Sequence, residues 1–415
     1  MLKIKDNVIE IIVSIGVLAL LLYSCSADIR PDSQRYLSGG NLHDPPIYPT
    51  LIFVMKFIFG TLNSVIVFQS LLIGISIIYF SRIVTNHFNL DIVTRSIVTF
   101  FLFIPILKFY DHLLTEPIGY AFSILFVSFV IKLIYNFNIQ NITWCTIFVI
   151  AMLLLRNQFL FLYPVILLLY LGILIIYCSK KTCIILIISF LSIFSSHNAL
   201  LSLSNYINNK YISLENKIVS NNSKGIFFFT YIDAIYISTS KDAELFENKE
   251  LGNTVGLILR EMENKKSLMK NYNSRGHFSV SLKKIRNYSN TLLVDLALKE
   301  NTTLIYLKKK ISIKLISANF KKYIIHIFKK FYDSTWLFAF VPFFMMIPSL
   351  IYFKKYKSKY SLLILFLSIF TIANHSVIYL FGRVQPRYLI YTDFILLIFI
   401  FITFAIFYKK EIIKI

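Results

Sequence analysis

Ten long apolar runs separate the polar segments of this chain, and they constrain its fold more than any other feature. A helix needs about 20 apolar residues to cross the hydrocarbon core of a bilayer. Of the 415 residues, 57% are hydrophobic, and the mean hydropathy is +0.68. Because a soluble protein cannot bury so much apolar surface, the sequence predicts an all-α polytopic membrane protein. The ten predicted spans lie near residues 8–27, 62–80, 96–110, 117–134, 142–155, 159–177, 182–200, 336–353, 360–381 and 389–408.

Charged residues predict which side of the membrane each loop occupies. Lys and Arg gather in alternate short segments, from Lys3 and Lys5 at one end to Lys409 and Lys410 at the other. Because short cytoplasmic loops carry an excess of cations, both termini are predicted to be cytoplasmic. The net charge of +22 then reflects the inner loops and membrane lipids as partners, rather than nucleic acid. The localisation that follows is a bacterial inner (cytoplasmic) membrane, with the acid-bearing loops on its outer face.

One long polar segment, 201–335, divides the chain into three parts. Residues 1–200 hold spans one to seven and a first outer loop at 28–61, and residues 336–415 hold the last three spans. The segment itself is predicted to be a large outer loop, because long loops translocate regardless of their charge. Its Asn/Ser/Lys-rich start, 205–225, is typical of a loop.

Three helices are predicted outside the spans. Residues 282–299 carry an apolar stripe through Ile285, Leu292 and Leu296. Residues 313–331 repeat apolar side chains every three or four positions with lysines off the stripe, which indicates an amphipathic helix in the membrane interface. Residues 48–60 are apolar but too short to span, so they are predicted to form a helix on the outer surface.

Residues that could carry chemistry all fall on the predicted outer face. A carboxylate there could take a proton from a hydroxyl, and arginine could neutralise phosphate oxygens. Candidate catalytic acids are Asp32, Glu116 and Asp44. Candidate substrate-binding residues are Arg35, Tyr36, His43, Tyr48, His112, Arg156, Arg383, Arg387 and Tyr388.

Each candidate also has a structural interpretation. Asp32 could be a solvated loop acid, Glu116 could suit the positive end of a helix, and Arg156 could reach the interface beside lipid headgroups. Arg387 with Tyr388 could form an interface anchor, and the histidines could be structural. The sequence has no Walker loop and no dinucleotide-binding glycine motif, so a group donor would be membrane-borne.

Several short motifs, in their order along the chain, resemble a known superfamily. PDSQRYL and DPPIYPTL in the first outer loop, LLTEP before the fourth span, LLLRNQFLFLYP, VDLALKENTTLIYLKKK and PRYLIYTDFILL are similar to segments of GT-C fold glycosyltransferases that use polyprenyl-phosphate sugars. The size and the Lys/Ile/Asn-rich composition also resemble bacterial serotype-converting O-antigen glucosyltransferases.

The resemblance implies a fold, a reaction and partners. The fold is a GT-C-like helix bundle, and the reaction moves a hexose such as glucose from a polyprenyl-phosphate carrier to an outer glycan with inversion. Asp32 matches the general base, and Arg387 or Arg156 would stabilise the lipid phosphate. Many relatives carry two adjacent acids here, whereas Ser33 follows Asp32. No obligate metal is therefore expected, with a divalent cation as the alternative.

Two other functions remain open on the sequence. An O-antigen polymerase or ligase is also polytopic and basic with a large outer loop, but it acts on lipid-linked oligosaccharide. A flippase or transporter would place charges within spans around a cavity and would show internal repeats, which this sequence lacks.

The predicted topology can be tested with a reporter that is active only outside the cytoplasm. Fused after Asn222, the reporter should be active; fused after Lys357, it should be inactive, because the predicted spans put these positions on opposite sides. The reverse pattern would move every candidate residue to the cytoplasmic face.

Overall fold

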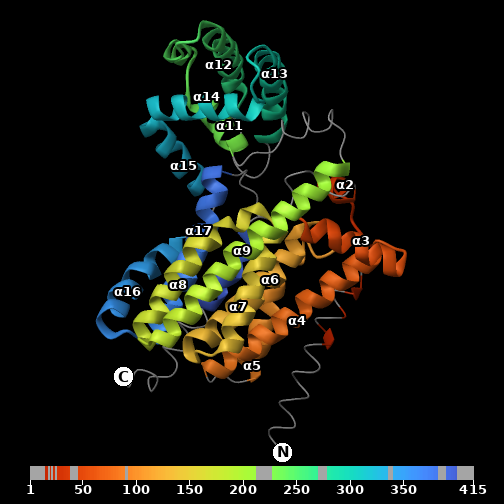
Figure 1. The fold of residues 1–415 in the computed structure, drawn as a ribbon, viewed down its shortest axis with the longest axis vertical. Coiled ribbons are helices and arrows are strands. Elements are labelled where there is room, and N and C mark those ends of the chain that lie inside the picture. Colours follow the sequence, from red (N-terminus) through yellow and green to blue (C-terminus); the bar gives the residue numbers. More distant parts are fainter. Residues whose placement is uncertain are drawn as a thin grey trace, which may run out of the picture. The chain divides into compact units, whose positions relative to one another are not determined.

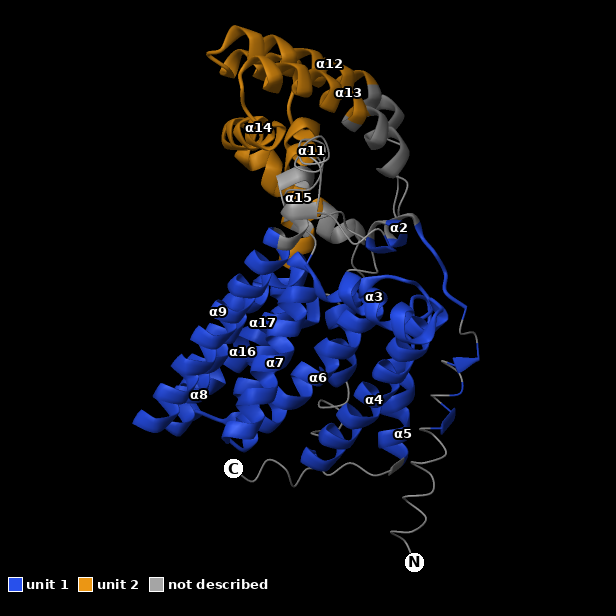
Figure 2. Cartoon of the chain, turned by 45° about the vertical axis from the view of Figure 1, so that its right-hand side comes forward, with its two compact units in different colours: residues 1–207, 337–375, 386–415 blue, residues 208–336, 376–385 orange. Residues whose placement is uncertain are grey.

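The chain folds almost entirely into helices. The structure is a computed structural model that describes residues 15–16, 19, 22–23, 26–37, 45–88, 92–211, 227–269, 278–334, 340–381 and 389–399. It is about 86% helical, with no strand in that part of the chain, which confirms the predicted all-α class. Two compact units are present: unit 1 (residues 1–207, 337–375 and 386–415) and unit 2 (residues 208–336 and 376–385), coloured separately in Figure 2.

Unit 1 holds the membrane helices (Figure 1). Among the described residues, five helical stretches are long and apolar enough to cross a bilayer, so the protein is a membrane protein. They are α4 (Asn63–His87), α6 (Thr115–Tyr135), the continuous pair η1 (Asn157–Phe161) and α8 (Leu162–Tyr177), α9 (Lys180–Tyr211) and α17 (Lys359–Phe381).

Three shorter apolar helices overlap other predicted spans: α5 (Ile92–Phe103), α7 (Ile139–Leu155) and a C-terminal helix, Leu389–Phe399. α16 (Val341–Tyr356) lies in the predicted span 336–353 and runs three residues past it. The predicted span 96–110 is helical only through Phe103, and turns follow over 104–111. Pro105 accounts for this end, because proline lacks an N–H and disfavours helical backbone at the residue before it. Most of the predicted first span lies outside the described residues, so the count of ten stays a prediction.

Two helices lie in the segment between the first two predicted spans. α2 (Pro31–Leu37) was not predicted. α3 (Ile47–Phe59) agrees with the helix predicted over 48–60, and it ends at Gly60, whose φ of 72° is left-handed. Glycine adopts this conformation without the steric cost that a side chain would add.

α6 is the centre of unit 1. It packs between α4 and α7 (Figures 1 and 2). Of the 18-residue apolar stretch of α6, 83% is buried, whereas only 22% of the corresponding stretch of α9 is buried. Small buried residues such as Ser70 on α4 and Ser123 on α6 let helices approach closely. Gly119 on α6 likewise lets the C-terminal helix approach closely, because a Cβ at position 119 would lie 2.5 Å from Cε1 of Tyr391. This contact places Tyr391 beside the first turn of α6.

Unit 2 has its own apolar core. Its helices are α11 (Phe227–Ile237), η2 (Ser240–Leu245), α12 (Lys249–Met269), α13 (Phe278–Lys299), α14 (Leu304–Ala318) and α15 (Phe320–Ser334). The predicted stripe of α13 is confirmed, since Ile285 and Leu296 are buried in this core and Leu292 packs against it.

Two sequence predictions in this region are wrong. The helix expected over 313–331 is broken at Asn319, which separates α14 from α15. The Asn319 amide side chain bonds the Leu315 carbonyl, and such local bonds compete with helix continuation. The buried face of α14 runs through residues such as Leu307 and Ile311, while Ile313 is 55% exposed. The loop expected over 205–225 is helical as far as Tyr211, and residues 212–226 lie outside the described chain.

The core of unit 2 predicts a contrast between two leucines of α12. Leu259 is fully buried, so Leu259→Ala should cost about 2–5 kcal/mol of stability. Leu257 is 47% exposed, so Leu257→Ala should stay within about 0.5 kcal/mol. Hydrogen exchange of α12 amides in the full-length protein in detergent would measure both. Equal effects would contradict the assigned core.

Candidate functional site

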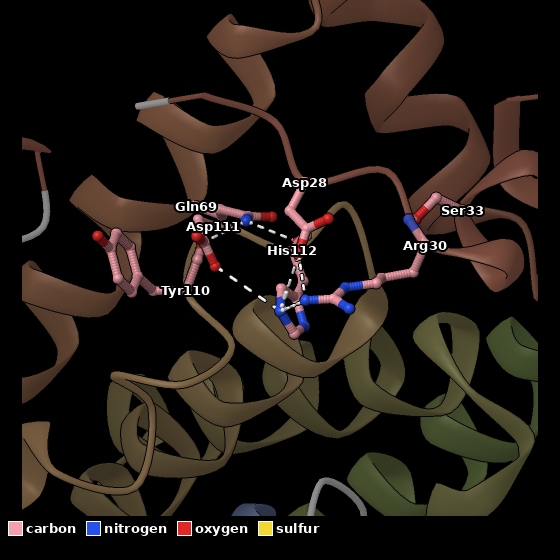
Figure 3. A network of polar contacts seen from close by, with 7 residues as sticks. All are labelled: Asp28, Arg30, Ser33, Gln69, Tyr110, Asp111 and His112. Atoms are coloured by element: carbon pink, nitrogen blue, oxygen red, sulfur yellow. Dashed lines mark hydrogen bonds and ion pairs between the residues drawn. The ribbon is translucent and has the colours of Figure 1, made fainter. Parts of the chain in front are cut away.

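Two polar segments before α2 and α6 are joined by backbone hydrogen bonds. The Asp28 N–H donates to the Asp111 carbonyl at 3.0 Å, and the Leu113 N–H donates to the Asp28 carbonyl at 3.2 Å. From α4, the Gln69 side chain donates to the carbonyls of Tyr110 (2.6 Å) and His112 (3.0 Å). These bonds hold Asp28 and His112 side by side, as Figure 3 shows.

The side chains of this junction form a charged cluster around His112. Its Nε2 lies 3.3 Å from the Asp28 carboxylate, 3.9 Å from that of Asp111 and 3.2 Å from Arg30 Nη2, and Arg30 also pairs with Asp28. Burial first, and then Arg30, lower the pKa of His112, while Asp111, Asp28 and Glu116 oppose them. The ring is therefore neutral at pH 7, able to accept a proton.

A second cluster lies where α6 begins and α7 ends. Glu116 is the second residue of α6 and only 2% exposed. Arg156 Nη1 lies 3.0 Å from Glu116 Oε1, 3.2 Å from Thr115 Oγ1 and 3.1 Å from the Tyr391 hydroxyl. Arg156 caps α7 with extended backbone (φ −161°, ψ 134°), which turns the chain into η1. Arg156 is thus ion-paired with a buried acid, a role that the sequence interpretations did not include.

Tyr48 lies on α3, which packs against α2 and α7. Its side chain is fully buried and contacts the edge of Tyr36 at 5.1 Å between ring centroids. Burial chiefly, then Tyr36 and Glu116, raise the pKa of the Tyr48 hydroxyl, so it stays protonated. His112 lies four residues before Glu116 in the segment that leads into α6, and α3 packs against α7, which ends at Arg156. The Tyr48 hydroxyl has no hydrogen-bond partner within the described chain, a state that costs about 1–3 kcal/mol unless a ligand meets it.

A line of polar contacts extends the site toward α17. Gln158 donates to Asn374 at 2.7 Å, and Asn374 donates to Thr392 at 3.0 Å. Beside them, His375 lies 3.7 Å from Asp393. Sequence reasoning missed these residues and Tyr391. The available signal was the Asn-His pair inside an otherwise apolar run, because polar residues within spans are costly and usually functional.

The structure brings two pairs of predicted residues into contact, Tyr36 with Tyr48 and Glu116 with Arg156. A fifth predicted residue, His112, lies four residues before Glu116. Asp32 and Arg35 lie in α2, but their side chains are outside the described part. His43, Asp44, Arg383, Arg387 and Tyr388 also lie outside the described residues, and their roles stay predictions.

Ser33, which stands beside Asp32, is a structural residue of α2. Its hydroxyl accepts the Arg30 N–H at 2.9 Å, and its own N–H donates to the Arg30 carbonyl at 2.8 Å. Within the described residues, no group of three or more His, Cys, Asp or Glu side chains is placed to hold a metal ion. The expectation about a metal stays untested.

The chain was compared with models of known protein families and with curated proteins. No family model matches it, and no curated protein matches it. The resemblance to GT-C glycosyltransferases therefore rests on the short sequence motifs alone.

The buried Arg156–Glu116 pair predicts strong non-additivity. Arg156→Met should destabilise the protein by about 3–5 kcal/mol, because it removes the guanidinium that offsets the charge of a buried carboxylate. Adding Glu116→Gln should recover much of that loss, since the buried negative charge is then gone. Denaturation of the four proteins in detergent completes the cycle. Additive losses would show that the two side chains do not form a coupled pair.

Proposed function

We propose that this protein is a GT-C-type glycosyltransferase that moves a hexose from a polyprenyl-phosphate carrier to an outer glycan such as O-antigen. The observation that carries the proposal is the polar site in unit 1. A buried acid–arginine pair lies where α6 begins, and a histidine between two acids lies four residues before that buried acid. An unsatisfied tyrosine hydroxyl lies on α3, which packs against α7. This site offers acids for proton transfer and cations for a phosphate at membrane depth.

In the proposed reaction, Asp32 accepts the proton of the acceptor hydroxyl. The resulting oxygen attacks the anomeric carbon, and the bond from that carbon to the lipid phosphate breaks with inversion. The electron pair leaves with the phosphate, whose charge is stabilised by Arg387 and by the partly exposed guanidinium of Arg156.

The described side chains support this chemistry by holding the charged and polar groups in place. Glu116 and Tyr391 fix the Arg156 guanidinium, so it presents a fixed charge without rearrangement during reaction. The Tyr48 hydroxyl stays protonated and can donate to a sugar or phosphate oxygen. Gln69 and the backbone bonds fix His112 and Asp28 beside each other.

The same proposal includes a topology. The chain crosses the membrane ten times, both termini are cytoplasmic, and the site faces outward in a bacterial inner membrane. A polyprenyl-phosphate donor held in that leaflet would reach the site without a nucleotide-binding motif, which the sequence lacks.

The general-base role is tested by Asp32→Asn, which preserves size but cannot accept the proton. Transfer from purified polyprenyl-phosphate glucose to acceptor glycan should fall by about 10²–10⁴. Asp295→Asn, at an exposed position of α13, should transfer normally. Near-normal transfer by Asp32→Asn would remove Asp32 from this role. A wild-type protein that uses only lipid-linked oligosaccharide would instead be the polymerase or ligase.

A further inference from the structure

An apolar groove of about 540 Å³ lies in unit 1 between α8, α16 and α17. This volume is within the range of about 300–1,000 Å³ that small-molecule sites occupy. Leu168 and Leu171 line it from α8, and Leu350 from α16, all about half exposed. The buried Leu362 and Phe366 line it from α17.

The groove follows α8 from Val165, in its first turn, as far as Ile175, near its last residue Tyr177. Arg156 precedes η1 and α8, so the end of the groove near Ile175 is the one farther along α8 from the candidate site. α8 and α17 meet closely here, because a Cβ on Gly172 would collide with the Leu362 side chain. α16 is less buried than α8: only Pro342, Ser349 and Phe353 are buried along α16.

Two lysines stand at this end of the otherwise apolar groove. Lys354 is in the last turn of α16, Lys357 caps that helix, and both are exposed. No carboxylate among the described residues pairs with either ammonium group. The neighbouring Lys359 instead donates to the Tyr135 carbonyl.

The backbone of Lys357 ends α16. Its φ of 50° is left-handed, as is that of Cys178 at the end of α8, and its N–H donates to the Phe353 carbonyl at 2.8 Å. Lys357 therefore closes the last turn of the helix, next to Lys354.

We infer that this groove binds an anionic membrane phospholipid. An acyl chain lies between α8 and α16, and the phosphate contacts Lys354 and Lys357. The occupant is a bilayer phospholipid because the groove is apolar along its length and cationic only at its end, which matches one chain and one anionic headgroup. The positive-inside rule puts this end at the cytoplasmic leaflet, where anionic lipids attract lysine clusters. The inference does not depend on the proposed enzymatic activity.

Native mass spectrometry of the full-length protein, titrated with phosphatidylglycerol or with phosphatidylcholine of the same chains, tests the charge contribution. The wild type should prefer phosphatidylglycerol. The double variant Lys354→Gln/Lys357→Gln should bind it about thirtyfold more weakly, since each lysine near an anionic surface contributes about fivefold. Lys180→Gln/Lys181→Gln, at two exposed lysines outside the groove lining, should bind normally.

A second pair of variants tests the groove itself. Leu168 and its neighbour Leu167 are about equally exposed on α8, but only Leu168 lines the groove. Leu168→Trp should fill the groove and reduce binding of both lipids, while Leu167→Trp should leave binding unchanged. Melting temperatures of all variants confirm that each is folded.

Three results would overturn the inference. Equal loss in the Lys180/Lys181 variant would mean general attraction to the surface. Undiminished binding by Leu168→Trp would mean that the groove holds no lipid and has another occupant, such as residues 400–415 of this chain. Lysine-dependent binding of polyprenyl phosphate without binding of phosphatidylglycerol would identify the wrong lipid.

Discussion

The ion pair between Arg156 and Glu116 is the interaction on which the candidate site depends. An apolar bundle cannot hold an isolated carboxylate, because the desolvation of an unpaired charge is too costly. Arg156 meets this requirement and also bonds Tyr391, so the start of α6, the end of α7 and the C-terminal helix converge on one guanidinium. Gly119, one turn along α6, allows the close approach of Tyr391 that completes the cluster.

The neighbouring groups acquire their protonation states from the same apolar surroundings. Burial favours the neutral forms of both His112 and Tyr48. The charge of Glu116 opposes this effect at His112 and adds to it at Tyr48. The site therefore combines two ion pairs, Arg156–Glu116 and Arg30–Asp28, with a neutral tyrosine hydroxyl and a histidine whose neutral form is favoured.

The sequence predicted what depends on local pattern. Apolar length identified five helices that are long enough to cross a bilayer, and period identified the buried stripe of α13. The break at Asn319 was missed because the apolar period continues through this position. The Asn319 side chain bonds the Leu315 carbonyl, and such a local bond competes with continuation of the helix. Within the site, Arg156 and Glu116 were named, but their contact with Tyr391 joins residues 235 positions apart. No pattern within one helix encodes such a contact, which depends on how the helices pack.

The two ends of unit 1 differ in how their charged groups are balanced. At one end, polar groups are buried and satisfy one another, so charge is compensated within the protein. At the other, Lys354 and Lys357 are exposed beside an apolar groove, and no carboxylate among the described residues pairs with them, so they are open to an anion from outside the protein. An anionic headgroup can bring negative charge to Lys354 and Lys357. At the end that holds the candidate site, an anion could bind only next to Arg156. A membrane protein built this way could hold a structural lipid at one face and reserve the other for a lipid-linked substrate.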